Sequence, residues 1–209
     1  MTLELTFHSL ADAADPAFQD VLSIYNEAFP DDQRMSQGRL ANLLAQQALH
    51  ITACASGGEI VGFAAYLRPH GHRFSWLEYF AVRRDRRGAG VGSALFRWTA
   101  AAAAHGAAGM LLEVEPPNTA ANDDERDLRL ARLSFYQRLG CLALPGLEYS
   151  MWTPRGDIPM ELLFYPGEER GPAAADERSH LYAMIHQAVV DRREFYQRVS
   201  AEWRRRQGS

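Results

Sequence analysis

The chain has 209 residues, of which 47% are hydrophobic and 23% are charged, which is the balance of an ordinary globular protein. Its formal net charge of -4 excludes a global positive field that would attract nucleic acid or an anionic lipid surface. Its two cysteines are too few for a disulfide framework, and no Cys-x-x-Cys pair indicates a zinc or redox site.

The N-terminal third is predicted to contain a strand, two helices and a hairpin. The opening segment lacks the basic residues and the apolar run of a secretory signal, and no later run of apolar residues could span a bilayer, so we expect a cytoplasmic protein. Pro30 should end the first helix, and Gly57-Gly58 is a two-residue hairpin signal. The elements predicted here are a strand at 3–7, helices at 18–29 and 36–49, and hairpin strands at 51–56 and 60–67.

The middle of the chain alternates strands and helices. An arginine- and glycine-rich loop separates the first strand from the first helix, and Pro116-Pro117 closes the next strand. The acidic segment 118–127 is expected to be a mobile loop, and Gly140 is placed as a helix stop. The elements predicted here are strands at 74–82 and 109–115 and helices at 91–105 and 128–140.

The end of the chain divides into short strands and a final helix. Strand-like segments occur at 142–144, 149–152 and 162–165. We expect a domain at 1–166, a linker at 167–176 and a C-terminal helical extension at 177–209. The apolar stripe of this last helix could pack on its own core or on a second subunit, so a homodimer is one possibility. The order β–α–α–β–β–β–α–β–α–β indicates a mixed α+β fold.

The loop Arg87-Gly88-Ala89-Gly90-Val91-Gly92, followed by Ser93 and a helix, has the form of a phosphate site. Glycines let backbone amides approach a diphosphate, and the new helix adds unpaired N–H groups and the positive end of its dipole. The alternative is that the loop is a glycine-rich connector that binds no ligand, because such a connector has the same composition. A Walker A loop needs a lysine that Gly92-Ser93-Ala94 does not supply, and the G-x-G-x-G spacing does not fit the dinucleotide fingerprint.

Two segments together resemble one family. Arg87–Gly92 is similar to the Q/R-x-x-G-x-G/A motif of the GNAT superfamily of N-acetyltransferases, and Phe135–Gly140 resembles its F-Y-x-x-x-G helix signature. The resemblance spans about residues 20–152. It implies an α+β fold with a mixed central sheet, splayed parallel strands, helices on both faces and, here, an added C-terminal helix. It also implies transfer of an acetyl group from acetyl-CoA to a primary amine, by direct attack through a tetrahedral intermediate and without a metal.

The resemblance also suggests where the cofactor would bind. In such enzymes the strand before the loop offers backbone groups to the pantetheine arm, in a gap that here would lie between 76–82 and 109–115. The loop amides hold the CoA diphosphate. The cofactor residues carried over are Phe80, Ala81, Val82, Arg87, Gly88, Ala89, Gly90, Val91, Gly92 and Ser93. Arg83, Arg84 and Arg86 could pair with CoA phosphates or could simply be solvated.

Tyr136 stands where the family has its general acid, which protonates the departing CoA thiolate. Glu78 is the first candidate for the base that neutralises the amine, and Glu115 is the second, with Glu113 in reserve. Strand alternation would place Glu78 on the side of Phe80 and Val82. Arg129 and Arg132 replace the family's usual Asn and Ala, which leaves open a catalytically silent domain that senses acyl-CoA.

The sequence says least about the acceptor, the molecule that would receive the acetyl group. The acidic stretch with Asp123, Asp124, Glu125 and Asp127 would attract a cationic amine, which favours a small-molecule acceptor over a protein, although a solvated loop has the same composition. His70 and His72 have no carboxylate or cysteine cluster beside them, so we expect no metal site. Nothing near Cys141 marks it as an activated nucleophile.

Overall fold

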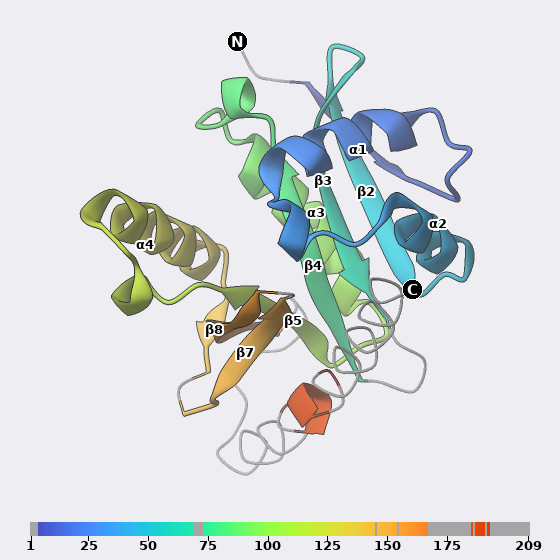
Figure 1. Ribbon diagram of the computed structural model, residues 1–209. Helices are drawn as coiled ribbons and strands as arrows, with labels where there is room; N and C mark the ends of the chain where they lie inside the picture. Colours follow the sequence, from blue (N-terminus) through green and yellow to red (C-terminus); the bar gives the residue numbers. More distant parts are fainter. Residues whose placement is uncertain are drawn as a thin grey trace. The chain divides into compact units, whose positions relative to one another are not determined.

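The computed structural model of the chain describes residues 4–68, 73–144, 146–153, 155–166, 185, 187–190 and 192 (Figure 1). The chain forms two compact units, Met1–Leu112 and Glu113–Ser209, and the boundary between them falls within one strand. The first unit carries the glycine-rich loop. The second carries the helix with Tyr136.

A mixed sheet forms the centre of the first unit. Strands β1 (Leu5–Ser9), β2 (Leu49–Ser56), β3 (Glu59–Leu67) and β4 (Phe74–Val82) are antiparallel neighbours in that order. β5 (Gly109–Val114) runs parallel to β4. The parallel register extends from Phe74 and Gly109 to Leu77 and Leu112, whereas β4 itself continues to Val82. The last five residues of β4 therefore extend past the final parallel pair.

Helices cover both faces of this sheet (Figure 1). Tyr79 of β4 packs its ring on Tyr25 of α1 (Ala17–Ala28), whereas its neighbour Phe80 packs on Phe96 of α3 (Val91–Ala104). Because successive strand residues point to opposite faces, α1 and α3 lie on opposite sides of β4. α2 (Gln37–Ala45) packs on β2, and a 3₁₀ turn, η1 (Asp31–Gln33), lies between α1 and α2. The predicted mixed sheet with helices on both faces is confirmed.

The predicted helix at 36–49 was too long at its C-terminal end. α2 ends at Ala45, and Gln47 adopts a left-handed backbone with φ of 56°. The Ala48 N–H donates to the Leu43 carbonyl and the Gln47 N–H donates to the Leu44 carbonyl, which is the Schellman pattern of a helix end. Leu49 is instead the first, fully buried residue of β2. The apolar spacing continued through the turn, so periodicity alone could not detect this end.

The second unit begins within β5 and contains a helix and a three-strand arrangement. After η3 (Pro117–Thr119) comes α4 (Asp123–Arg138). β8 (Gly156–Tyr165) pairs antiparallel with both β6 (Leu142–Ala143) and β7 (Tyr149–Thr153). β8 starts six residues before the predicted 162–165 segment, because Asp157 and Pro159 hid its first half from a strand pattern.

The acidic segment predicted as a mobile loop is partly helical. Asn122 caps α4, since its side chain accepts a hydrogen bond from the Glu125 N–H at 2.9 Å. Asp123, Asp124 and Glu125 occupy the first turn, where carboxylates interact favourably with the helix dipole. The N-cap and acidic first turn were readable in the sequence, and the prediction overlooked them.

The predicted linker at 167–176 and the histidine turn at 70–72 lie outside the described residues. Of the predicted C-terminal helix, residues 185, 187–190 and 192 are described, and all are helical. Within the described part of the chain, no helix combines the length and apolarity that a membrane crossing requires.

Candidate functional site

The loop between β4 and α3 depends on glycine at two positions. Gly88 and Gly90 have φ of 80° and 84°, a left-handed conformation that strongly favours glycine. A Cβ atom at either position would meet nothing within 4 Å, so the backbone angle and not the available space selects glycine. Gly90 is the N-cap of α3, and its carbonyl accepts the first helical hydrogen bond, from the Ala94 N–H at 3.1 Å.

This geometry presents a row of amides at a helix N-terminus. The N–H groups of Val91, Gly92 and Ser93 precede Ala94 and therefore have no acceptor within α3. They add to the positive end of the helix dipole, which is an arrangement that binds phosphate. All the residues carried over as cofactor ligands, from Phe80 to Ser93, lie along this strand, loop and first helical turn of the first unit.

Arg87 ties the loop back to the strand. Its Nε donates to the carbonyl of Val82 at 3.0 Å, across five residues of chain. Arg83 N–H in turn donates to Val61 on β3. The predicted cofactor residue Arg87 therefore holds the loop against the end of β4, and the Val82 carbonyl already has a hydrogen-bond donor.

Glu78 is the extra residue of a β-bulge. In the β3–β4 register, Ala65 pairs with Tyr79 and the next residue, Tyr66, pairs with Leu77. The register therefore skips Glu78. A bulge re-aims side chains and interrupts strict alternation. The prediction that Glu78 shares a side with Phe80 by alternation therefore does not follow from the register. The half-buried Glu78 carboxylate raises the pKa values of the Tyr79 and Tyr25 hydroxyls beside it, although burial raises both more strongly.

Two tyrosine hydroxyls hold the segment between α1 and α2. The Met35 N–H donates to the Tyr25 hydroxyl at 2.8 Å and to the Tyr79 hydroxyl at 3.3 Å, and the Tyr79 hydroxyl donates to the Gln33 carbonyl at 3.2 Å. Burial raises the pKa of Tyr25 to about 12 and that of Tyr79 well above its usual value. No local sequence signal marks this cluster beside Glu78, because Met35 and Tyr79 are 44 residues apart in the chain.

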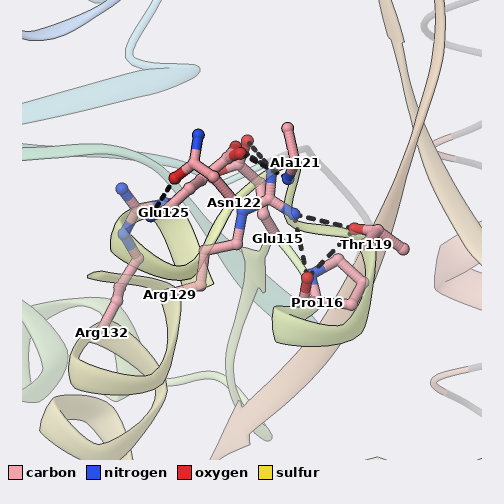
Figure 2. A network of polar contacts seen from close by, with 8 residues as sticks. All are labelled: Glu115, Pro116, Thr119, Ala121, Asn122, Glu125, Arg129 and Arg132. Carbon is pink, nitrogen blue, oxygen red and sulfur yellow. Dashed lines mark hydrogen bonds and ion pairs between the residues drawn. The ribbon is translucent and has the colours of Figure 1, made fainter. Parts of the chain in front are cut away.

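In the second unit, Glu115 belongs to a network of ion pairs (Figure 2). Its Oε2 accepts from Arg132 Nη1 at 2.9 Å, and its Oε1 accepts from Arg129 Nη2 at 3.4 Å. Arg129 also donates to the Pro116 carbonyl, to the Thr119 hydroxyl and to Glu125. The side chain at the family's asparagine position thus fastens the β5–α4 connection, and both oxygens of Glu115 are engaged.

The same network extends to the start of α4 (Figure 2). Glu125 Oε2 accepts from the Ala121 N–H at 2.8 Å. This backbone hydrogen bond and, to a lesser extent, the Arg129 charge hold the pKa of Glu125 below its usual value. Asp123 pairs with Arg126 at 3.2 Å. Two of the four acidic residues of this stretch, Asp123 and Glu125, are therefore paired with arginines of their own helix.

Tyr136 is the buried residue of α4. Burial raises the pKa of its hydroxyl, the Cys141 thiol raises it slightly, and the Arg132 charge, one helical turn away, opposes the rise. The hydroxyl therefore stays protonated at neutral pH, as a proton donor must. Cys141 is buried, and burial raises the pKa of its thiol to about 12, which agrees with its dismissal as a nucleophile.

Glu113, the reserve candidate, has partners from two other segments. Tyr149 of β7 donates to its Oε1 at 2.9 Å, and Arg192 donates to the same oxygen at 3.2 Å through Nε and 3.0 Å through Nη2. Only 7% of the Arg192 side chain and 9% of the Glu113 side chain are exposed. Glu113 is thus a structural anchor within the second unit. Among the described residues, no group of three or more His, Cys, Asp or Glu side chains could hold a metal ion.

Comparison with known proteins agrees with this geometry. The model of the acetyltransferase (GNAT) family matches residues 18–140. No curated protein matches the sequence. A structure described as a GNAT-family acetyltransferase from Bacteroides thetaiotaomicron superposes with a TM-score of 0.65 at 19% identity, covering 88% of this chain and 94% of its own.

Two further solved structures share the fold. An aminoglycoside 6'-N-acetyltransferase complexed with coenzyme A superposes with a TM-score of 0.61 at 16% identity, covering 80% of this chain and 99% of its own. The ribosomal-protein-S18-alanine N-acetyltransferase of Escherichia coli superposes with a TM-score of 0.56 at 21% identity, covering 82% of this chain and 99% of its own. One acts on a small molecule and the other on a protein, so the shared fold does not select an acceptor.

Proposed function

The chain belongs to the acetyltransferase (GNAT) family, and from this premise we propose that it transfers the acetyl group of acetyl-CoA to a primary amine of a small molecule. The observation that carries the proposal is the loop with left-handed Gly88 and Gly90, which presents amides at the start of α3. A diphosphate is the part of acetyl-CoA that such amides bind. The end of β4, from Phe80 to Val82, would accompany the pantetheine arm.

The proposed reaction needs a base and an acid. The base removes a proton from the ammonium, and the neutral amine attacks the thioester carbonyl to form a tetrahedral intermediate. As the C–S bond breaks, the acid protonates the departing thiolate. The amine nitrogen loses its second proton, which restores the acid through solvent, and the base releases the first proton to solvent. The products are the N-acetylated amine and CoA with a free thiol.

We assign the base to Glu78 and the acid to Tyr136. The bulge sets Glu78 apart from the regular sheet, whereas Glu115 has arginine nitrogens at both of its oxygens. Both oxygens of Glu115 are thus already occupied by arginines of the second unit. Glu115 therefore remains the second candidate. Tyr136 is proposed as the acid because its buried hydroxyl keeps its proton.

For the acceptor we propose a small amine, such as a polyamine, an aminoglycoside or an amino-acid derivative. The partly neutralised start of α4 weakens the idea that an acidic rim attracts the amine, because Arg126 and Arg129 already pair with Asp123 and Glu125. The support that remains is the family chemistry and the aminoglycoside enzyme with the same fold. A homodimer and a cytoplasmic location stay predictions.

A free-thiol assay with acetyl-CoA and a panel of amines tests this function. We expect turnover with at least one small primary amine, and Tyr136→Phe should lower kcat by about 10²–10⁴-fold while CoA affinity stays nearly constant. Tyr66→Phe is the matched control, since it removes a buried hydroxyl from β3 in the other unit.

Three outcomes would count against the proposal. Activity restricted to hydroxyls or to protein N-termini would contradict the small-amine acceptor. CoA binding without any turnover would favour the alternative of a silent acyl-CoA sensor. If the panel produced neither turnover nor CoA binding, the proposed function itself would be wrong.

A further inference from the structure

Four of the five residues 83–87, at the start of the glycine loop, are arginines, and two of them are held by carboxylates. Arg83 donates to Asp85 at 3.2 Å and 3.1 Å and lies 3.6 Å from Glu59. Arg86 contacts Glu59 at 3.3 Å and Asp85 at 3.4 Å. Glu59 is the first residue of β3, so this group, the Glu59 cluster, joins the β2–β3 hairpin to the cofactor loop.

Arg84 differs from its neighbours. It opens the 3₁₀ turn η2 (Arg84–Arg86) and is exposed. Among the described residues, its guanidinium takes part in no hydrogen bond or ion pair. Arg87, in contrast, is fastened to Val82. Of the four arginines beside the loop, Arg84 is thus the one whose charge is uncommitted within the described chain.

CoA carries two phosphate groups of different character. The diphosphate is expected at the loop amides, and a phosphomonoester on the 3′-oxygen of the ribose is the other. Only the ribose separates the two groups, so a side chain next to the diphosphate loop can reach the second one. A phosphomonoester is close to a dianion at neutral pH, and a planar guanidinium binds such a group through parallel N–H donors.

We propose that Arg84 binds the 3′-phosphate of CoA, whereas Arg83 and Arg86 hold the loop in place through Glu59 and Asp85. This assignment rests on the proposed use of acetyl-CoA and deepens it, because it names the residue that distinguishes the complete cofactor from its dephosphorylated form. It also gives an acidic residue, Glu59, a positioning role beside an anionic ligand.

Calorimetric binding of CoA and of 3′-dephospho-CoA to the full-length protein tests the assignment without knowledge of the acceptor. We expect the wild type to bind CoA about tenfold more tightly than 3′-dephospho-CoA, as one charge-assisted contact at an exposed site allows. In Arg84→Gln this preference should fall to about one, with the affinity for 3′-dephospho-CoA nearly unchanged.

Arg97→Gln is the matched control, because Arg97 is an exposed arginine on α3 and its loss changes the net charge equally. We expect it to keep the preference for CoA. Since the field of a distant charge acts on both ligands, equal weakening of both by Arg84→Gln would overturn the assignment. Loss of the preference in Arg97→Gln instead would move the site to α3 and would also overturn it.

Glu59→Gln tests whether Arg83 and Arg86 position the loop or bind the phosphate themselves. If Arg83 and Arg86 were phosphate ligands restrained by Glu59, removing this negative charge would release them and increase the preference for CoA. We expect the preference to stay within about twofold of the wild-type value and the affinity for both ligands to fall together. A rise in the CoA preference would overturn the positioning role.

The failure of this inference can be told from the failure of the proposed function. A wild-type protein that binds neither ligand contradicts acetyl-CoA as the cofactor. A wild-type protein that binds both ligands equally well keeps acetyl-CoA as the cofactor and contradicts only the assignment of Arg84.

Discussion

The two units hold their candidate functional residues by different means. In the first unit, backbone geometry does so: left-handed glycines shape the loop, a bulge displaces Glu78, and tyrosine hydroxyls bind the main chain of residues 33–35. In the second unit, guanidinium–carboxylate pairs hold Glu115 and Glu113.

This difference teaches that similar carboxylates, one in β4 and one just after β5, can have unrelated tasks. Glu78 and Glu115 were both candidate bases, yet Glu115 lies between two arginines and Glu78 lies beside two tyrosines. The first unit should therefore respond to changes of backbone and packing. The second should respond to the loss of a charge and to salt.

The sharpest test of the comparison exchanges each carboxylate for its amide. We expect Glu78→Gln to lower kcat/KM for the best amine by about 10²–10⁴-fold, because the base is removed. Glu115→Gln, the matched variant, should lower it by less than about tenfold, since the ion pairs that it loses are structural. Equal losses in the two variants would contradict the separation of their roles, and the reverse order would make Glu115 the base.

Packing in the first unit can be broken at Gly62. A Cβ atom there would lie 2.9 Å from the Ala81 carbonyl oxygen and 3.3 Å from Val82 Cγ2, so neighbouring strands would have to separate. We expect Gly62→Val to reduce the free energy of unfolding by about 3 kcal/mol. Denaturant titration followed by circular dichroism measures the change.

Gly38→Ala is the control for this variant. Gly38 lies inside α2 with open space around it, so alanine should raise the free energy of unfolding by about 0.5–1 kcal/mol. Unchanged stability of Gly62→Val would show that β3 and β4 can separate at no cost.

The second unit can be weakened at Arg129. Its guanidinium holds Pro116, Thr119, Glu115 and Glu125, and the side chain is only 10% exposed. Arg129→Met should lower the free energy of unfolding by about 2 kcal/mol, because the carbonyl of buried Pro116 and the half-buried Glu115 and Glu125 carboxylates lose a donor together. Arg126→Met, which breaks one exposed pair with Asp123, should cost less than about 1 kcal/mol.

Salt provides a second readout for the same pair of variants. High salt should reduce the stability of the wild type more than that of Arg129→Met, since the variant has already lost the charged network. Parallel salt curves for the two proteins would contradict an electrostatic role for Arg129.

The smallest expected effect concerns pH in the first unit. The pKa of Tyr25 is raised from 10.0 to about 12, so the folded state keeps its proton where an unfolded tyrosine loses it. Its contribution is fully present below pH 10 and is lost as the pH rises toward 12. Tyr25→Phe should cost about 1 kcal/mol at pH 7, through the lost Met35 hydrogen bond, and should flatten the decline above pH 10.

Urea midpoints between pH 7 and pH 11 check this prediction. If the wild type and Tyr25→Phe declined in parallel, Tyr25 would not be the group that titrates. A steeper decline in the variant would reverse the sign and contradict the buried-hydroxyl interpretation.

Several features of the fold and the site were predictable from the sequence because their signals are local. β4 was predicted over its observed range, Gly57-Gly58 marked the hairpin, and the glycine spacing indicated the loop before α3. Each of these depends on a few consecutive residues whose backbone preferences are strong. The N-cap of α4 was equally local. The prediction missed it because Asn122 was not considered as a cap, although the sequence contains the signal.

The sequence by itself determined the order of elements, the glycine-rich loop and the membership of a family, because apolar periodicity and glycine act over short stretches. Only the tertiary structure decided which charges meet. Arg132 donates to Glu115, which is 17 residues away in the sequence. Tyr79 donates to Gln33 over a separation of 46 residues, and Arg192 donates to Glu113 over 79. Such pairs depend on how strands and helices pack, and the sequence around a polar side chain does not indicate which distant residue it will contact.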